Sequence, residues 1–170
     1  DMEFHVLVTN FMNGHGFSYW AVSPDGSLVY EAIDDASKYL PSAYMPVLYP
    51  LFLATIVSFI GYTESSVFVI LIIQSLMGAF SCLLIKDLYE LKFDKKNSYL
   101  TAWLTAFFPL HILMSSQTSA SNLYVFLIIC VLYSYHLLIK NNSEKTALAL
   151  GLFLGLLTLA RADAILLIPA

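Results

Sequence analysis

Four long apolar stretches separated by short polar connections limit what this chain can fold into. They cover residues 66–85, 98–115, 122–139 and 146–160. A helix needs about 20 apolar residues to cross the hydrocarbon core of a bilayer. The chain is 59% hydrophobic and 12% charged, with a mean hydropathy of +0.75, which is too apolar for an ordinary soluble domain. We therefore expect an all-α, polytopic transmembrane helix bundle, followed by the start of a further apolar segment.

Lysines mark two of the polar connections and indicate how the spans are oriented. Four lysines follow the first span, and Lys140 and Lys145 follow the third. Positively charged connections stay on the cytoplasmic side of a membrane. Because two crossings separate these connections, both are expected to be cytoplasmic, which leaves residues 1–65 and 117–121 on the outer side.

A shorter apolar stretch, residues 47–61, determines where the first part of the chain lies. It has about 15 residues and includes Pro50, a length between that of a short span and that of an interfacial helix. If it crossed the membrane, the acidic segment before it would be cytoplasmic. We expect instead an extracytoplasmic first loop, residues 1–65, with juxtamembrane helices over about 1–14 and 47–61, followed by the bundle over 66–170.

The first loop is acidic, which narrows the classes of partner. It contains seven acids against a single base, Lys38. A chain without a basic face cannot neutralise phosphates in number, so nucleic-acid binding is excluded. Residues 24–26 have the composition of a turn, within an irregular polar loop that extends to about Ser42.

An amphipathic helix is expected at the start of this loop. Phe4, Leu7, Val8 and Phe11 recur at helical spacing, and Gly14 can end the helix in a left-handed conformation. The pattern predicts a helix lying beside the membrane, with its polar residues accessible.

Four polar residues of the first loop are candidates for chemistry. Asp1 can act as a general base, or it can cap the helix that follows it. Glu3 is interpreted as a first-turn acid favoured by the helix dipole, or as a substrate contact. His5 lies one turn from Asp1 and can orient it or bind an acceptor sugar. His15 is flanked by two glycines, which allow its backbone to approach a neighbour closely.

Arg161 is the second candidate centre and the only arginine of the chain. It follows the last apolar stretch, near the outer interface, where its planar guanidinium can bind phosphate oxygens. The alternative is a snorkelling arginine paired with Asp163. His111 and Gln117, at the outer end of the second span, are further candidate substrate contacts.

Several other kinds of site are not indicated. The four histidines show no metal-ligand spacing, so no metal site is predicted. Cys82 and Cys130 lie in apolar stretches and are interpreted as packing residues. Gly151 and Gly155 form a GxxxG pair, a weak signal for close helix packing, and Gln74 and Ser75 are expected to hydrogen-bond between helices.

In a fixed order, the sequence resembles motifs of one enzyme family, the GT-C glycosyltransferases related to protein O-mannosyltransferases and the lipid A aminoarabinose transferase. The segment Asp1-Met-Glu-Phe4 resembles an Asp-x-x-Tyr motif of the family's first outer loop, and Asn10-Phe-Met-Asn-Gly-His-Gly-Phe17 resembles its Asn-Leu-Leu-x-Gly-His-Gly-Tyr. Met45-Pro-Val-Leu-Tyr-Pro-Leu-Phe-Leu-Ala54 and Gly155-Leu-Leu-Thr-Leu-Ala-Arg161 are similar to two later motifs. The resemblance covers nearly all 170 residues and implies that a first span and a C-terminal part lie outside this sequence.

The resemblance implies a function and assigns roles to two residues. Asp1 would be the catalytic base, and Arg161 would contact the phosphate of a polyprenyl-phosphate-linked sugar donor. This chain also departs from the family pattern. Met45 stands where an Arg is usual, Phe4 replaces Tyr, and residues 120–122 lack an acid that many relatives carry.

The expected function is therefore inverting transfer of a sugar from a polyprenyl-phosphate carrier to an extracytoplasmic glycan, lipid or protein acceptor. The expected location is a prokaryotic plasma membrane, among membrane lipids, with the site on the outer face. No cofactor is implied with certainty, and a need for a divalent metal stays open, as do the sugar and the acceptor. The alternatives are a transporter or lipid flippase, and a noncatalytic scaffold that binds a partner through the acidic loop.

Overall fold

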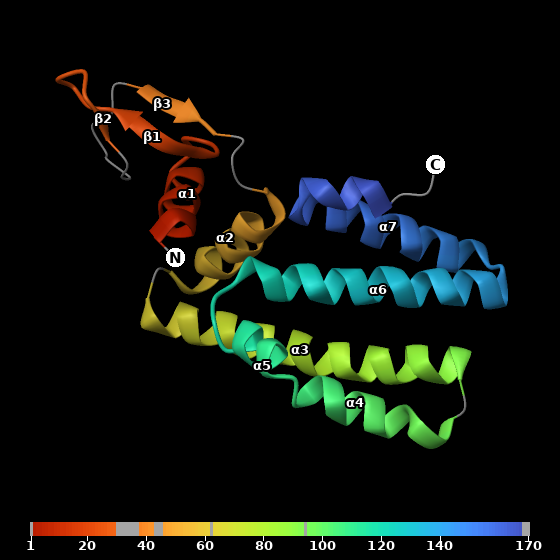
Figure 1. Ribbon diagram of the computed structural model, residues 1–170. Helices are drawn as coiled ribbons and strands as arrows, with labels where there is room; N and C mark the ends of the chain where they lie inside the picture. The colour runs from red at the N-terminus through yellow and green to blue at the C-terminus, as the bar shows by residue number, and fades with distance from the viewer. Residues whose placement is uncertain (1, 30–37, 43–45, 62, 94, 168–170) are drawn as a thin grey trace. The chain divides into compact units, whose positions relative to one another are not determined.

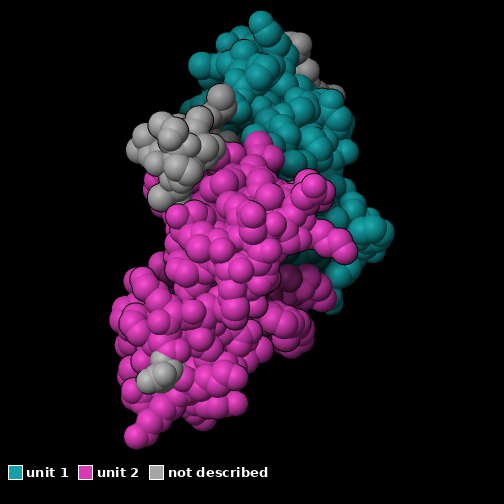
Figure 2. Space-filling model, turned by 90° about the vertical axis from the view of Figure 1, so that its right-hand side faces the viewer, with its two compact units in different colours: residues 1–66 teal, residues 67–170 magenta. Residues whose placement is uncertain are grey.

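The computed structural model describes residues 2–29, 38–42, 46–61, 63–93 and 95–167, and the side chains of 2, 3 and 165–167 are not included. The chain divides into two compact units, Asp1–Ser66 and Val67–Ala170, which Figure 2 shows in teal and magenta. Each unit is described separately.

The first unit packs two helices with a small sheet (Figure 1). Helix α1, Met2–Met12, contacts both strand β1 and helix α2, Leu48–Ile60. The phenyl ring of Phe4 on α1 meets the buried ring of Tyr49 on α2 edge-on, with centroids 4.8 Å apart. Both helices lie where the apolar pattern predicts them.

The buried face of α1 differs in part from the predicted one. Leu7 and Val8 are buried as expected, but Val6 is also buried, and Phe11 is exposed. Val6 and Leu7 form a core cluster with Tyr19 of β1. The face is therefore set by the strand that packs on it, which the helical spacing alone does not reveal.

A three-stranded antiparallel sheet occupies the segment that was expected to be an irregular polar loop. The central strand is β1, Ser18–Val22, with β2, Leu28–Val29, on one side and β3, Lys38–Pro41, on the other. Ala21 pairs with Val29 and with Tyr39. Burial alternates along β1, with Tyr19 and Ala21 buried and Trp20 exposed, as the two faces of a strand require. The all-α prediction is wrong for this segment.

The turn between β1 and β2 lies at the predicted position. Its Asp25 carboxylate accepts a hydrogen bond from the backbone N–H of Ser27 at 3.0 Å and another from its hydroxyl at 2.7 Å. These bonds favour the ionised form, and they hold the pKa of Asp25 below its ordinary value. Gly26 has φ +85°, which the turn needs and which a glycine adopts without strain.

The longer helices of the second unit run along a common direction (Figure 1). Helix α3, Glu64–Lys92, and helix α6, Ala120–Asn141, are long and apolar enough to cross a membrane by length and composition. Helix α7, Glu144–Ala160, packs against α6 and is followed by the short helix η2, Ala162–Leu167. The connection from α3, which includes η1, Lys95–Asn97, and the connection from α6 to α7 lie at the same end of this unit, as the lysine pattern predicts.

The predicted span over 98–115 is two helices. Helix α4, Ser98–Ala106, and helix α5, Pro109–Ser115, are separated at Phe107 and Phe108. Pro109 has no N–H to donate, and it disfavours helical geometry at the residue before it. Phe108 accordingly adopts φ −66° and ψ 118°.

Large apolar side chains are exposed along the helices of this unit. Phe68 and Phe80 on α3, Trp103 and Leu104 on α4, and Leu148 on α7 are each more than half exposed. A soluble monomer rarely exposes so much apolar surface, whereas a helix that faces lipid is expected to do so. The described part of the unit has the surface of a membrane-embedded helical protein.

Candidate functional site

The sequence assigns candidate roles to residues in both units, and the structure describes most of them. Asp1 lies outside the described residues. Glu3 is within α1, but its side chain is not described. His5 is exposed on α1, and His15 is exposed in the loop between α1 and β1.

The loop that carries His15 is held by a buried amide. Asn10 is fully buried, and its Nδ2 donates to the carbonyl oxygen of Ser18 at 2.9 Å. The carbonyl of Asn10 accepts from the backbone N–H of His15 at 2.9 Å. Gly14 and Gly16 have φ values of +83° and +71°, so the loop needs glycine at both positions. The Gly-His-Gly sequence thus forms a fixed turn that leaves the histidine side chain exposed.

The sheet brings an aromatic partner to His15 that sequence analysis missed. The imidazole stacks on the ring of Tyr39 in β3, with centroids 3.8 Å apart and planes 9° from parallel. The two residues are 24 positions apart, and only the pairing of β3 with β1 brings them together. Predicting these strands would have required recognising Ser18–Val22 and Lys38–Pro41 as short aromatic strands around a turn.

In the second unit, Arg161 ends helix α7 and has two partners. Its Nη2 lies 3.1 Å from a carboxylate oxygen of Asp163, and both side chains are about half exposed, at 55% and 52%. Its Cζ lies 4.9 Å from the ring centroid of Tyr124 on α6. The ion pair with Asp163, the alternative interpretation from the sequence, is therefore present. It leaves the guanidinium accessible, and a guanidinium in this setting can bind an anionic oxygen.

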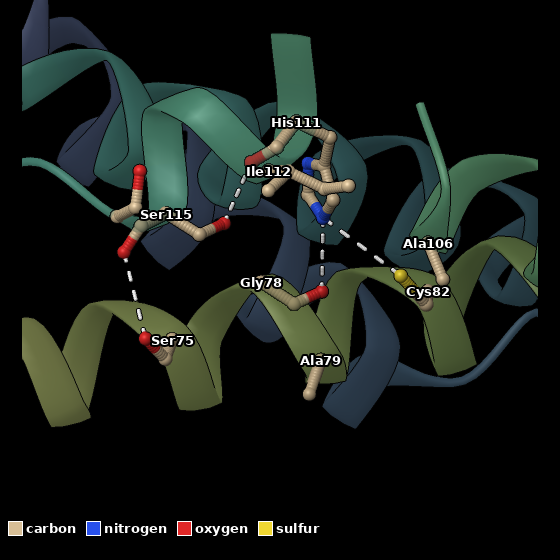
Figure 3. Close-up of a pocket in the computed structure, with 9 residues that line it drawn as sticks. Ser75, Gly78, Ala79, Cys82, Ala106, His111, Ile112 and Ser115 are labelled. Carbon is tan, nitrogen blue, oxygen red and sulfur yellow. Dashed lines mark hydrogen bonds between the residues drawn. The ribbon is translucent and has the colours of Figure 1, made fainter. Parts of the chain in front are cut away.

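His111 lies in a groove between α3 and α5 (Figure 3). The groove has a volume of about 300 Å³ and is lined by Gly78 and Cys82 of α3, among others, and by Ser115 of α5. The Nε2 atom of His111 is 3.1 Å from the carbonyl oxygen of Gly78 and 3.8 Å from Sγ of Cys82. A carbonyl oxygen only accepts, so the Nε2 atom carries the hydrogen in this bond.

A close approach of the backbone makes this contact between α3 and α5 feasible. A Cβ atom at Gly78 would lie 2.6 Å from Oγ of Ser115, closer than real atoms allow. The predicted GxxxG pair plays no such part, because a Cβ at Gly151 or at Gly155 would meet nothing within 4 Å. Among the described residues, Gly78 is the position in this unit where the absence of a side chain is required.

Gln117 is exposed in the turn between α5 and α6, beside a buried polar network. Nε2 of Gln74 on α3 donates to the carbonyl of Ser119 at 3.0 Å, and Nδ2 of Asn122 donates to the carbonyl of Gln74 at 2.7 Å. Ser75 also bonds to the carbonyl of Ser115, at 3.5 Å. The predicted interhelical bonds of Gln74 and Ser75 are confirmed, and they fix the N-terminal end of α6 on α3.

The described residues contain no group of three His, Cys, Asp or Glu side chains that could hold a metal ion. Both cysteines are free thiols, Cys82 half-buried and Cys130 buried. Among the candidate residues of the second unit, the structure thus describes a cation with an accessible edge, Arg161, and a hydrogen-bonded imidazole ring, His111.

Comparison with known proteins gives one match. Residues 44–170 match the family described as dolichyl-phosphate-mannose-protein mannosyltransferase. No curated protein and no solved structure matches the chain. The family match includes the helices of the second unit and α2, and it does not reach α1 or the sheet.

Proposed function

The chain belongs to the dolichyl-phosphate-mannose-protein mannosyltransferase family, and from this premise we propose that it transfers a sugar from a polyprenyl-phosphate carrier to an acceptor outside the cytoplasm. As a family member it is a membrane glycosyltransferase of the GT-C type. The match over residues 44–170 is the observation that carries the proposal. The lipid carrier, the extracytoplasmic acceptor and the residue roles below are parts of the proposal.

In the proposed reaction the carboxylate of Asp1 takes the proton of an acceptor hydroxyl. The hydroxyl oxygen attacks the anomeric carbon of the donor sugar, and the bond from that carbon to the phosphate oxygen breaks. The new bond forms on the face opposite the leaving group, so the configuration is inverted. General-base assistance of this kind contributes about 10²- to 10⁴-fold in rate.

Arg161 is the proposed partner of the departing phosphate. Its guanidinium is half exposed at the end of α7, with N–H donors in one plane that suit phosphate oxygens. Negative charge grows on the phosphate as the sugar leaves, and a cation placed there stabilises that charge. His5, His15, His111, Gln117 and Glu3 remain candidate substrate contacts.

The test is a transfer assay on the intact protein in nanodiscs with a polyprenyl-phosphate mannose donor. We expect Asp1→Asn to lower kcat by about 10²–10⁴-fold, and Arg161→Ala to lower turnover by about 10²–10³-fold. Asp25→Asn is the matched control, because that carboxylate is engaged within its own turn. Unchanged turnover in both test variants would refute the site assignment.

The same preparation separates the proposal from the transporter alternative. A flippase moves labelled carrier lipid across vesicles without any sugar acceptor, whereas a transferase consumes donor only when an acceptor is present. Lipid movement by a protein that transfers no sugar would favour the flippase.

A further inference from the structure

The guanidinium of Arg161 has partners of two kinds, a carboxylate and an aromatic ring, and this arrangement bears on how its anion site is regulated. Asp163 meets an N–H at the edge of the group, with Nη2 and Oδ2 3.1 Å apart. Its Cζ atom lies over the ring of Tyr124, 4.9 Å from the ring centroid. A guanidinium is planar and all its N–H donors point outward in that plane. The face and the edge can therefore be occupied at the same time by different partners.

An anion and the Asp163 carboxylate require the same part of Arg161. Both accept hydrogen bonds from the edge N–H groups, and a sugar phosphodiester carries one negative charge, as a carboxylate does. Tyr124 and Asp163 both contact the guanidinium in the structure, so the ring does not exclude a carboxylate from that edge. One anion can thus replace the other while the contact with Tyr124 persists.

The position of Tyr124 is set by a buried contact two residues earlier. Asn122 is 1% exposed, and its amide donates to the carbonyl of Gln74 on α3 at 2.7 Å. The hydroxyl of Ser119 caps the same helix end by accepting from the N–H of Ser121 at 3.2 Å. The first turns of α6, which carry Tyr124, are therefore anchored on α3.

We propose that Asp163 competes with the lipid-linked phosphate for the edge of Arg161, and that Tyr124 is a positioning residue that holds the guanidinium for either anion. The inference rests on the proposed function, in which Arg161 binds the donor phosphate. Asp163 keeps the guanidinium paired until a lipid phosphate displaces it. Because both charges are about half exposed, an ion pair of this kind alters a binding constant by no more than about fivefold.

The experiment measures binding of decaprenyl phosphate to the intact protein in nanodiscs by microscale thermophoresis. Asp163→Asn is expected to tighten binding about two- to fivefold, because the competing carboxylate is gone. Asp87→Asn is the matched control. Asp87 also forms a part-exposed ion pair, with Lys86 at 3.0 Å and 47% of its side chain exposed, but it lies near the C-terminal end of α3 and not at Arg161. It should leave binding unchanged.

Further variants identify the contact responsible. Arg161→Ala should weaken binding at least tenfold, and adding Asp163→Asn to it should have no further effect. Tyr124→Phe should bind within twofold of the wild type, whereas Tyr124→Leu should bind several-fold more weakly, both alone and together with Asp163→Asn. Tightening by Asp163→Asn that persists without Arg161 would show a general charge effect and overturn the inference.

Two controls separate the possible failures. Inorganic phosphate is titrated in parallel, and tightening seen with it but not with the lipid overturns the lipid assignment. Sugar transfer is measured on the same samples. No transfer by the wild type refutes the proposed function, whereas transfer combined with unchanged lipid binding in Asp163→Asn refutes the competition alone.

Discussion

At the scale of single residues, the contact between α3 and α5 depends on one missing side chain. Gly78 allows Ser115 and His111 to approach the backbone of α3, where Nε2 of His111 reaches the carbonyl oxygen of Gly78. The hydroxyl of Ser115 in turn donates to the carbonyl of His111 at 2.8 Å. The orientation of the His111 ring thus depends on the space at Gly78.

We expect Gly78→Ala to destabilise the protein although alanine is the better helix former. The added methyl lies 2.6 Å from Oγ of Ser115, and overpacking of this kind costs about 1–3 kcal/mol, whereas the gain in helix propensity is at most about 1 kcal/mol. Gly151→Ala is the control, because its methyl meets nothing within 4 Å. Thermal unfolding in detergent should show a lower apparent Tm for Gly78→Ala alone, by about 2–4 °C per kcal/mol.

A second variant tests the cause of this effect. Removing the hydroxyl by Ser115→Ala in the Gly78→Ala background should recover part of the lost stability. Equal melting of the Gly78→Ala and Gly151→Ala proteins would show that the approach at Gly78 is not tight.

At the scale of elements, the apolar stretches predict the helices well and the interruptions poorly. Helices α3, α6 and α7 lie where hydropathy places them, because burial in lipid requires long apolar runs with internally bonded backbones. The break between α4 and α5 was missed, since hydropathy is insensitive to the N–H that Pro109 lacks. The sheet was missed because its strands have only two to five residues, too short for a clear alternation of apolar and polar positions.

Pro109→Ala should join α4 and α5 into one continuous helix. Alanine restores an N–H and relieves the restriction on Phe108, which is extended in the structure. Hydrogen–deuterium exchange of a peptide covering residues 104–112 should therefore slow. Pro50→Ala is the control, because Pro50 lies in the first turn of α2, where proline is tolerated and its N–H is not needed. Exchange over 104–112 as fast in Pro109→Ala as in the wild type would place the cause of the break elsewhere.

At the scale of the whole molecule, the sequence motifs predicted the family correctly. The catalytic role of Asp1 stays a prediction. The family match begins at residue 44, so the motifs at Asp1 and at Asn10–Phe17 rest on their resemblance alone. Arg161 was predicted as a phosphate contact, but its contact with the Tyr124 ring could not be foreseen. Cation–π contact depends on how α6 and α7 pack, and neither the spacing nor the composition of the two helices encodes that register.

Cysteine labelling tests the predicted orientation of the intact protein. Ser27, in the turn after β1, is predicted to be outside, and Asn97, in the lysine-rich connection after α3, inside. A membrane-impermeant maleimide should label Ser27→Cys in intact cells and Asn97→Cys only after permeabilisation. The native Cys82 and Cys130 lie within helices and provide the background signal. Labelling of Ser27→Cys from the cytoplasmic side alone would reverse the orientation and exclude an external site.

The hydrogen bond from Gln74 to Ser119 sets how far the start of α3 extends beyond the α5–α6 turn along the helix direction. Gln74 is ten residues from the start of α3, so about 15 Å of that helix extends past the α5–α6 turn, as the yellow start of α3 does in Figure 1. This is about half the thickness of the hydrocarbon layer. A membrane that contains α3 over its full length therefore meets the α5–α6 turn at a different depth from the start of α3.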